Sequence, residues 1–294
     1  MGASFASSRL LRVTIGLLGL VTSALIWIEV GIGILNALVV ILVAFGLSLW
    51  LGEKVGISRR LSMLIGVGTS ICGASAIAAI SPAIEAEEEE VGLAIAGITL
   101  FGLISMFLYP FLYTNTLIQD LLLRNMNVYA IWVGSGIHET AQVLGAAGAL
   151  GSEVIQPAMM IKSIRIFMIG PVVLVANYIY NNYRAEKKTA KVDLPWFGIV
   201  FIVNTLVCAF LDSYVSNVTV LGFSWPFAKT FLKGRVIPFL LAVSFAGVGC
   251  KVRFKNIAKL GLKPFMVAAI IAVSAGVVAL ALAVLVAPVI PILG

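Results

Sequence analysis

Long apolar runs separated by short polar segments make up most of the chain. Continuous runs of this kind favour membrane helices over the alternating strands of a membrane barrel. Windows of about 20 residues, the length that crosses a bilayer as a helix, identify nine runs, at residues 11–28, 32–51, 62–80, 91–112, 129–150, 157–180, 195–212, 230–250 and 264–287. The pattern predicts an all-α polytopic membrane protein of about nine transmembrane helices, forming one transmembrane domain over residues 1–294.

Composition supports this class and excludes several others. Of the 294 residues, 61% are hydrophobic and 11% are charged, whereas soluble domains carry about 25% charged residues. The three cysteines form no C-x-x-C pair, and His138 is the single histidine. We therefore expect no metal centre, no cofactor and no disulfide framework, and we expect neither an enzyme nor a nucleic-acid-binding protein.

The basic residues indicate an orientation. With nine crossings, fifteen of the twenty lysines and arginines fall in loops on one side, and three fall on the other, together with the acidic run 85–90. Because basic loops stay in the cytoplasm, we expect a cytoplasmic N-terminus and an external C-terminus. The same count places Glu88 outside and Lys188 inside.

The third apolar run contains the small residues of Gly66–Ser75 and is followed by Pro82. Glycine permits a non-helical turn, and the restarted half-helix then directs its N–H groups and positive dipole into the protein. A broken helix is the favoured interpretation. The alternative is a small-residue face for close helix packing.

The fifth run places His138, Glu139 and Gln142 inside an apolar segment. Unpaired polar groups are costly there, so we expect them to face a cavity or one another. A functional site is favoured over a purely structural hydrogen-bond cluster. Lys162 and Arg165 share a face of the sixth run, where an anion-facing role competes with snorkelling to the interface.

A third small-residue segment, Ser244–Gly249, lies in the eighth run. The third and eighth runs are an odd number apart and would cross in opposite directions. This predicts an inverted repeat (1–112 and 129–287) with two discontinuous helices near the midplane. Gly68–Ile71 and Gly134–Ile137 are also similar, at an offset of 66, but two full crossings apart they would run parallel, so we do not expect them to mark the repeat.

These features predict a polar mid-membrane cavity for an anion. Backbone N–H groups near Gly73 would supply partial positive charge, and His138 would supply a switchable charge. Glu139 points about 100° from His138 on an ideal helix, so it is expected to orient a neighbouring helix. The expected lining residues are Thr69, Ser70, Gly73, Ser75, His138 and Gln142, with Glu139, Lys162 and Arg165 as supporting or coupling residues.

Several blocks resemble the YeiH family of bacterial inner-membrane proteins, to which sulfate export is ascribed. The resemblance covers essentially the whole chain. It implies one or two transmembrane segments before the loop at which this chain begins, and a fold similar to sodium–proton antiporters and bile-acid transporters. The matching blocks are the segment Gly68–Pro82 with the following glutamates, Leu100–Pro110, Gly134–Val143, Lys162 with Arg165, and Gly261–Pro264.

The resemblance implies a secondary transporter that exports sulfate or an organosulfonate across the bacterial inner membrane, by elevator-type alternating access. The chain has no phosphate-binding loop that would indicate ATP use. Two alternatives remain, a cation–proton exchanger that uses Glu139 and a non-transporting membrane scaffold. The expected partners are a small anion and the lipid bilayer, and a homodimer is one assembly open to such a chain.

Overall fold

The computed structural model describes residues 2, 5–21, 33–184, 196–214, 219–220, 223–249 and 261–290. The chain forms two compact units. The smaller comprises Met1–Ile28 with Pro195–Val252, and the larger comprises Glu29–Leu194 with Arg253–Gly294. Two predicted features lie outside the described residues: the end of the first apolar run, and the basic residues 187–191 and 251–259.

In the smaller unit, an N-terminal helix packs on a long apolar helix. Its elements are η1 (Phe5–Leu10), α2 (Leu11–Leu18), η2 (Gly19–Val21), α13 (Trp196–Tyr214), α14 (Trp225–Phe231), η3 (Leu232–Val236) and α15 (Ile237–Gly249). The amide of Asn204 on α13 donates to the carbonyl of Gly16 at 2.9 Å. A Cβ at Gly19 would overlap the Phe201 backbone, so glycine is what allows this close approach.

The connection after α13 contains the strands β1 (Thr219–Val220) and β2 (Phe223–Ser224), which pair antiparallel. This short hairpin is the one departure from an all-helical fold among the described residues. Asp212 ties α13 to α14, because its carboxylate accepts from the indole of Trp225 at 2.8 Å and from Lys229 at 2.5 Å.

The predicted break is not seen within Ser244–Gly249, since α15 is helical from Ile237 to Gly249, and residues 250–260 lie outside the described part of the chain. Glycine lowers helix propensity by about 1 kcal/mol, which an apolar environment readily offsets. Small residues also allow close helix packing, so they do not by themselves interrupt a helix.

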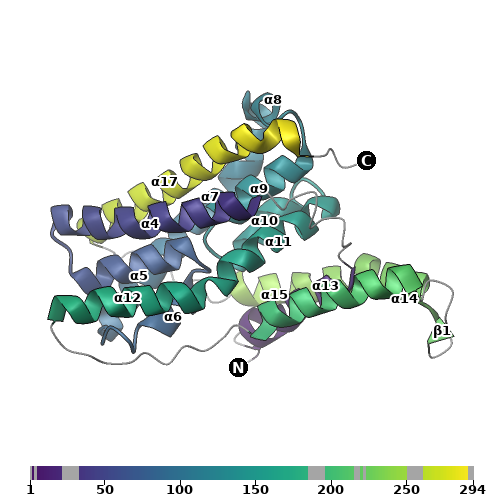
Figure 1. The fold of residues 1–294 in the computed structure, drawn as a ribbon, viewed down its shortest axis with the longest axis horizontal. Coiled ribbons are helices and arrows are strands. Elements are labelled where there is room, and N and C mark those ends of the chain that lie inside the picture. The colour runs from purple at the N-terminus through teal and green to yellow at the C-terminus, as the bar shows by residue number, and fades with distance from the viewer. Residues whose placement is uncertain are drawn as a thin grey trace. The chain divides into compact units, whose positions relative to one another are not determined.

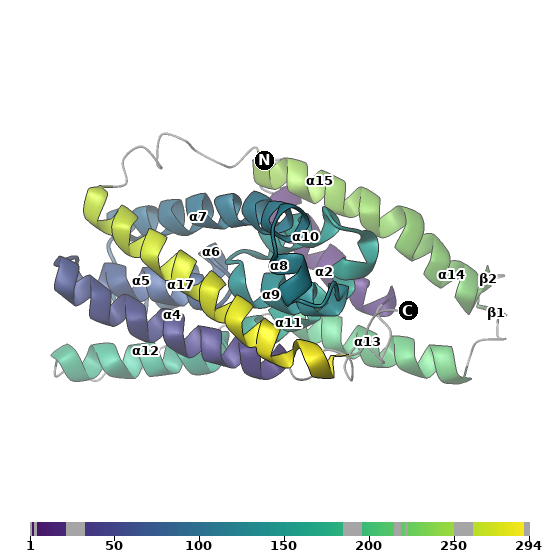
Figure 2. The same ribbon diagram turned by 90° about the horizontal axis from the view of Figure 1, so that it is seen from above.

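The larger unit is built on four helical segments long and apolar enough to cross a membrane. Three are α4 (Gly33–Val55), α7 (Glu88–Asn115) and α17 (Leu262–Val286, continued by η4, Ala287–Val289). The fourth combines α11 (Ser152–Phe167) and α12 (Ile169–Arg184), which meet at Met168. In Figures 1 and 2, α4 and α17 lie side by side.

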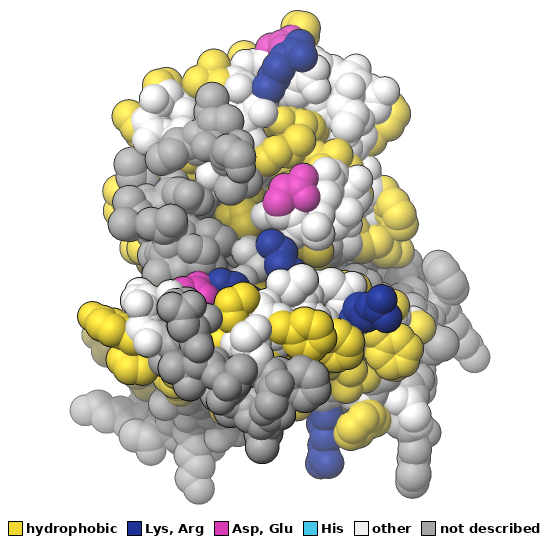
Figure 3. Space-filling model, turned by 90° about the vertical axis from the view of Figure 1, so that its right-hand side faces the viewer, with side chains coloured by type: hydrophobic (Ala, Val, Ile, Leu, Met, Phe, Trp, Pro, Cys, Tyr) yellow, Lys and Arg dark blue, Asp and Glu magenta, His cyan; other side chains and the backbone are white. Residues whose placement is uncertain are grey.

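Hydrophobic side chains on these helices face outward. Leu42, Phe107 and Val273 are 73%, 67% and 63% exposed. The face drawn in Figure 3 shows hydrophobic side chains together with several Lys, Arg, Asp and Glu side chains. Exposed hydrophobic residues on the long helices suit contact with lipid rather than water.

The third apolar run does not cross the unit, because it folds back on itself. It forms α5 (Arg59–Ser70) and α6 (Ala74–Ile80), joined by a tight turn. Ser58, which caps α5, contacts Glu90 at the start of α7. The chain therefore returns from α6 to the end from which α5 began, and we name this segment the first hairpin.

The fifth apolar run folds in the same way, as α9 (Met126–Gly136) and α10 (Thr140–Gly148). The hydroxyl of Tyr129, near the start of α9, donates to the carbonyl of Ala146 at 3.1 Å, near the end of α10. This segment is the second hairpin.

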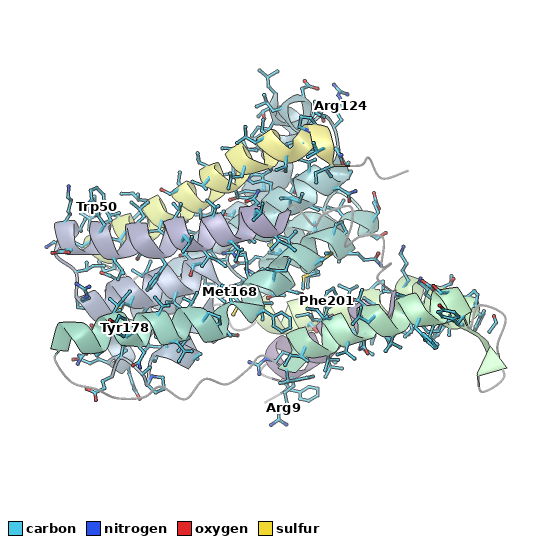
Figure 4. The ribbon with its side chains drawn as sticks, in the orientation of Figure 1. Arg9, Trp50, Arg124, Met168, Tyr178 and Phe201 are labelled. Carbon is cyan, nitrogen blue, oxygen red and sulfur yellow. The ribbon has the colours of Figure 1, made fainter. Side chains whose placement is uncertain are left out.

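The two hairpins enter the larger unit from opposite ends. Helix α7 runs between them, followed by the short helix α8 (Ile118–Leu121). At one end of α17, Lys263 Nζ lies near Gly56, just before the first hairpin. At the other end, Asn125 at the start of the second hairpin donates to Ile290 at 2.9 Å. Figure 4 likewise places Trp50 and Arg124 at opposite ends of this unit.

This arrangement corrects two of the nine predicted crossings, the third and the fifth. The glutamates before α7 are at the same end as the basic loop after α4, since Arg60 contacts Glu87 at 3.3 Å. Tyr180 on α12 is also at this end, accepting from Arg60 Nε at 2.9 Å. A hydropathy window counts apolar length and cannot detect a reversal of direction.

We expect a cysteine at Glu88 to be labelled from the cytoplasmic side by a membrane-impermeant maleimide. The physical reason is that Glu88 is at the end that carries Lys54, Arg59 and Arg60, and basic loops remain cytoplasmic. A cysteine at Asp120 should be labelled from the opposite side. A cysteine at Glu53 is the matched control, and labelling of Glu88 from the side opposite to Glu53 would contradict the hairpin.

Candidate functional site

The turn of the first hairpin depends on a glycine that no other residue replaces easily. Gly73 has φ +74° and ψ −130°, a conformation costly for a residue with a Cβ. Its N–H donates to the carbonyl of Gly68 at 2.9 Å. A Cβ at this position would overlap Glu139 of the second hairpin, so the two turns pack directly against each other.

The turn of the second hairpin is made by extended residues and a new helix cap. Ile137 and Glu139 have ψ near +145°, which interrupts the helix after Gly136. Helix α10 restarts with a capping box, in which the Gln142 side chain accepts from the Glu139 N–H at 3.0 Å. The Glu-x-x-Gln spacing is a sequence signal for such a helix start, although the sequence analysis treats this segment as one span.

Lys162 holds both turns through backbone carbonyls. Its Nζ donates to Ile71 of the first hairpin at 2.8 Å and to Ile137 of the second at 2.9 Å, and it also contacts the carbonyl of His138. Three acceptors match the three N–H groups of an ammonium. The side chain is fully buried, so snorkelling to an interface is wrong for this lysine.

Arg165, one turn later on α11, acts in the same way and is also fully buried. Five carbonyl oxygens surround its guanidinium at 2.5–3.3 Å, two from the first hairpin and three from the second. They belong to Thr69, Ser70, Gly134, Ser135 and Ile137. Nη2 donates to Thr69 alone, so within the described residues one of its two N–H groups has no recorded acceptor.

The two cations therefore lie where α5 and α9 end. The last carbonyls of a helix lack partners within the helix and carry its negative dipole end. Two such ends meet at Lys162 and Arg165, which provide both hydrogen-bond donors and opposite charge. Away from water these carbonyls would otherwise be unsatisfied, at a cost of several kcal/mol.

Glu139 provides the complementary negative charge at the helix starts. Its carboxylate accepts from the N–H of Ala74, the first residue of α6, and caps α10 through the N–H of Gln142. Thr99 on α7 donates to it at 3.4 Å. The positive ends of α6 and α10 thus share one carboxylate, and this carboxylate occupies the helix end where the sequence analysis places the anion.

Three residues whose carbonyls bind the two cations have buried side-chain polar atoms with no hydrogen-bond partner. These atoms are the hydroxyls of Thr69 and Ser135 and both ring nitrogens of His138. All three residues are at most 1% exposed. Buried polar atoms are normally paired, so an unpartnered set at the junction of two hairpins marks the part of the larger unit most suited to a ligand.

The remaining predicted residues separate into two groups. The carbonyl of Ser70 binds Arg165, and its hydroxyl donates to Val67 of its own helix at 3.2 Å. Gln142 is occupied with Glu139 and the carbonyl of Thr99. Ser75 is exposed, and no recorded contact joins it to the cations.

Ser135 and Thr99 are the residues that the sequence analysis missed. A signal for Ser135 exists in the similarity of Gly68–Ile71 to Gly134–Ile137, because both segments end a helix at the corresponding isoleucine. Thr99 carries no comparable signal in an apolar run. Among the described residues, no group of three or more His, Cys, Asp or Glu side chains could hold a metal ion.

Replacing Gly73 by alanine should lower the free energy of unfolding by about 1–3 kcal/mol, the usual cost of a strained backbone conformation. The new Cβ would also displace Glu139 from the cap. Thermal unfolding in detergent measures the effect, and Gly92→Ala is the control because a Cβ there meets nothing within 4 Å. Equal melting temperatures for the two variants would contradict the tight contact between the turns.

Comparison with known proteins identifies the family. A family model described as "Conserved hypothetical protein 698" matches residues 1–268. A UPF0324 membrane protein of Pseudomonas aeruginosa is 31% identical over 276 residues, covering 92% of this chain and 74% of the relative.

Two further relatives are named UPF0324 inner membrane protein YeiH. The one from Escherichia coli K12 is 32% identical, with 92% of this chain and 74% of the relative covered. The one from Salmonella typhi is 33% identical, with 91% and 73% covered. No solved structure matches. The resemblance seen in the sequence motifs is thereby confirmed, and the chain belongs to the UPF0324 family of membrane proteins.

Proposed function

We propose that the protein is a secondary transporter of a small anion. The observation that carries this proposal is the meeting of two oppositely directed helical hairpins at buried charges. Broken helices and ionisable groups are costly inside a membrane, and transporters use them where substrate is bound. A scaffold would not need Lys162, Arg165 and Glu139 at one buried point.

The sign of the charge favours an anion. Lys162 and Arg165 outnumber Glu139, and Glu139 is already engaged with helix N-termini and Thr99. A cation exchanger would need an acidic group available to the ion. The unpartnered hydroxyls of Thr69 and Ser135 can each donate to an oxyanion.

We propose sulfate or an organosulfonate as the substrate and export as the direction, both taken from the family resemblance. The two compact units support elevator-type alternating access, because that mechanism needs one body that carries the site and another that remains fixed. We also propose a location in the bacterial inner membrane, with the N-terminus in the cytoplasm.

Transport of labelled sulfate and methanesulfonate by proteoliposomes tests the proposal. We expect counterflow of at least one of these anions and no sodium flux. Sodium–proton exchange without anion flux would favour the cation exchanger. No flux of any of these solutes in folded protein would favour the scaffold.

Thr69→Val and Ser135→Ala should weaken anion binding by about ten- to a hundredfold each, the value of one hydrogen bond to a charged group. Neither variant should lower the melting temperature, because the lost hydroxyl makes no hydrogen bond in the protein. Thr205→Val is the control, as this buried threonine bonds only Phe201 of its own helix at 2.9 Å. Unchanged anion affinity in both variants would remove these hydroxyls from the site.

A further inference from the structure

The hairpin junction is the place where the two turns meet at Lys162, Arg165 and Glu139. The hydrogen bonds around these three side chains indicate the charge that each one carries. The three carbonyl acceptors of Lys162 occupy three N–H donors, which only the ammonium form has. The guanidinium of Arg165 is always charged. Glu139 receives hydrogen bonds from N–H and O–H donors alone, as an ionised carboxylate does.

The junction therefore carries one net positive charge. The other titratable groups here are His138, Cys72 in the first turn and Tyr109 on α7. We count them as neutral, because a buried charge needs a partner and neither ring nitrogen of His138 has one. Cys72 and Tyr109 are 7% and 5% exposed, and His138 is 1% exposed. Water does not screen this charge, so the junction should strongly prefer an ion that carries one negative charge.

The donors left over belong to Arg165 itself and to two residues whose carbonyls bind it. Arg165 Nη2 retains one N–H, and its recorded acceptor is the carbonyl of Thr69. Arg165 Nη1 binds the carbonyl of Ser135. Nη1 also contacts the carbonyls of Gly134 and Ile137. Of the residues whose carbonyls bind the two terminal nitrogens, Thr69 and Ser135 carry hydroxyls, and both hydroxyls are unpartnered. One charged N–H and two hydroxyls would satisfy the three oxygens of a sulfonate.

We propose that this junction is selective for a monovalent oxyanion, of the organosulfonate class, bound by Arg165, Thr69 and Ser135. The inference rests on the proposed function and narrows its substrate. A monoanion neutralises the junction, whereas a dianion such as sulfate leaves one uncompensated negative charge inside the membrane. An unpaired charge buried inside the membrane costs free energy, so binding of the dianion should be weaker than binding of the monoanion.

Titration of purified protein with methanesulfonate and with sulfate, near neutral pH, tests the charge preference. We expect sulfate to bind at least about tenfold more weakly, because tenfold requires only a small part of the cost of an unpaired buried charge. Equal or tighter binding of sulfate would overturn the inference while leaving anion transport intact. Binding of neither anion would overturn both this inference and the proposed function.

The variant Glu139→Gln makes the test sharper. It removes one negative charge from the junction while an amide oxygen can still accept from the capped N–H groups. The ratio of sulfate to methanesulfonate affinity should rise by at least about tenfold. Glu153→Gln, at the exposed start of α11, changes the total charge equally and should leave the ratio unaltered.

An unchanged ratio in folded Glu139→Gln would refute the charge count. If this variant does not fold, the comparison of the two anions on the wild-type protein still decides the question. Lys162 and Arg165 are not suitable for this purpose, because their loss would leave seven backbone carbonyls of the two turns without donors.

Discussion

The larger unit depends on one constraint, that helix ends buried away from water need partners. Two hairpins place four helix ends at one point, and the described residues contain three charges there, each at the helix end of opposite dipole sign. Lys162 and Arg165 satisfy the carbonyl ends of α5 and α9, and Glu139 satisfies the N–H ends of α6 and α10. The same charges then define which ions the junction can accept.

The chemistry of the junction was more predictable from sequence than its topology. Polar residues in apolar runs identified His138, Glu139, Lys162 and Arg165, because such residues are costly unless they are used. The break at Gly73 was predictable, because glycine permits a non-helical turn. The reversal of direction at the two hairpins was not predictable, since residues 59–80 and 126–148 are each long enough to cross a membrane as a straight helix. Contacts such as those from Ser58 to Glu90 and from Tyr129 to Ala146 reveal the reversal.

That reversal gives the similarity of Gly68–Ile71 and Gly134–Ile137 a structural counterpart, because each segment ends the first helix of a hairpin. Counted as full crossings the two segments would run parallel, but as hairpins entering from opposite ends they meet turn to turn. The charge pattern is compatible with the new topology, because Glu87, just before α7, pairs with Arg60 at the basic end. The orientation of the two chain ends stays a prediction from the basic loops.

Contact between the two turns is the central claim, and bridging of cysteines by Hg²⁺ tests it directly. Lys162 binds the carbonyls of both Ile71 and His138, so Cys72 and a cysteine at position 138 should be bridged within one chain when Cys208 and Cys250 are replaced by serine. After cleavage at a protease site engineered into the connection between the two hairpins, the Hg²⁺ bridge should keep the two fragments joined. Fragments that separate as readily as those of a control with its second cysteine at the exposed Ala149, at the far end of α10, instead of position 138 would contradict the account.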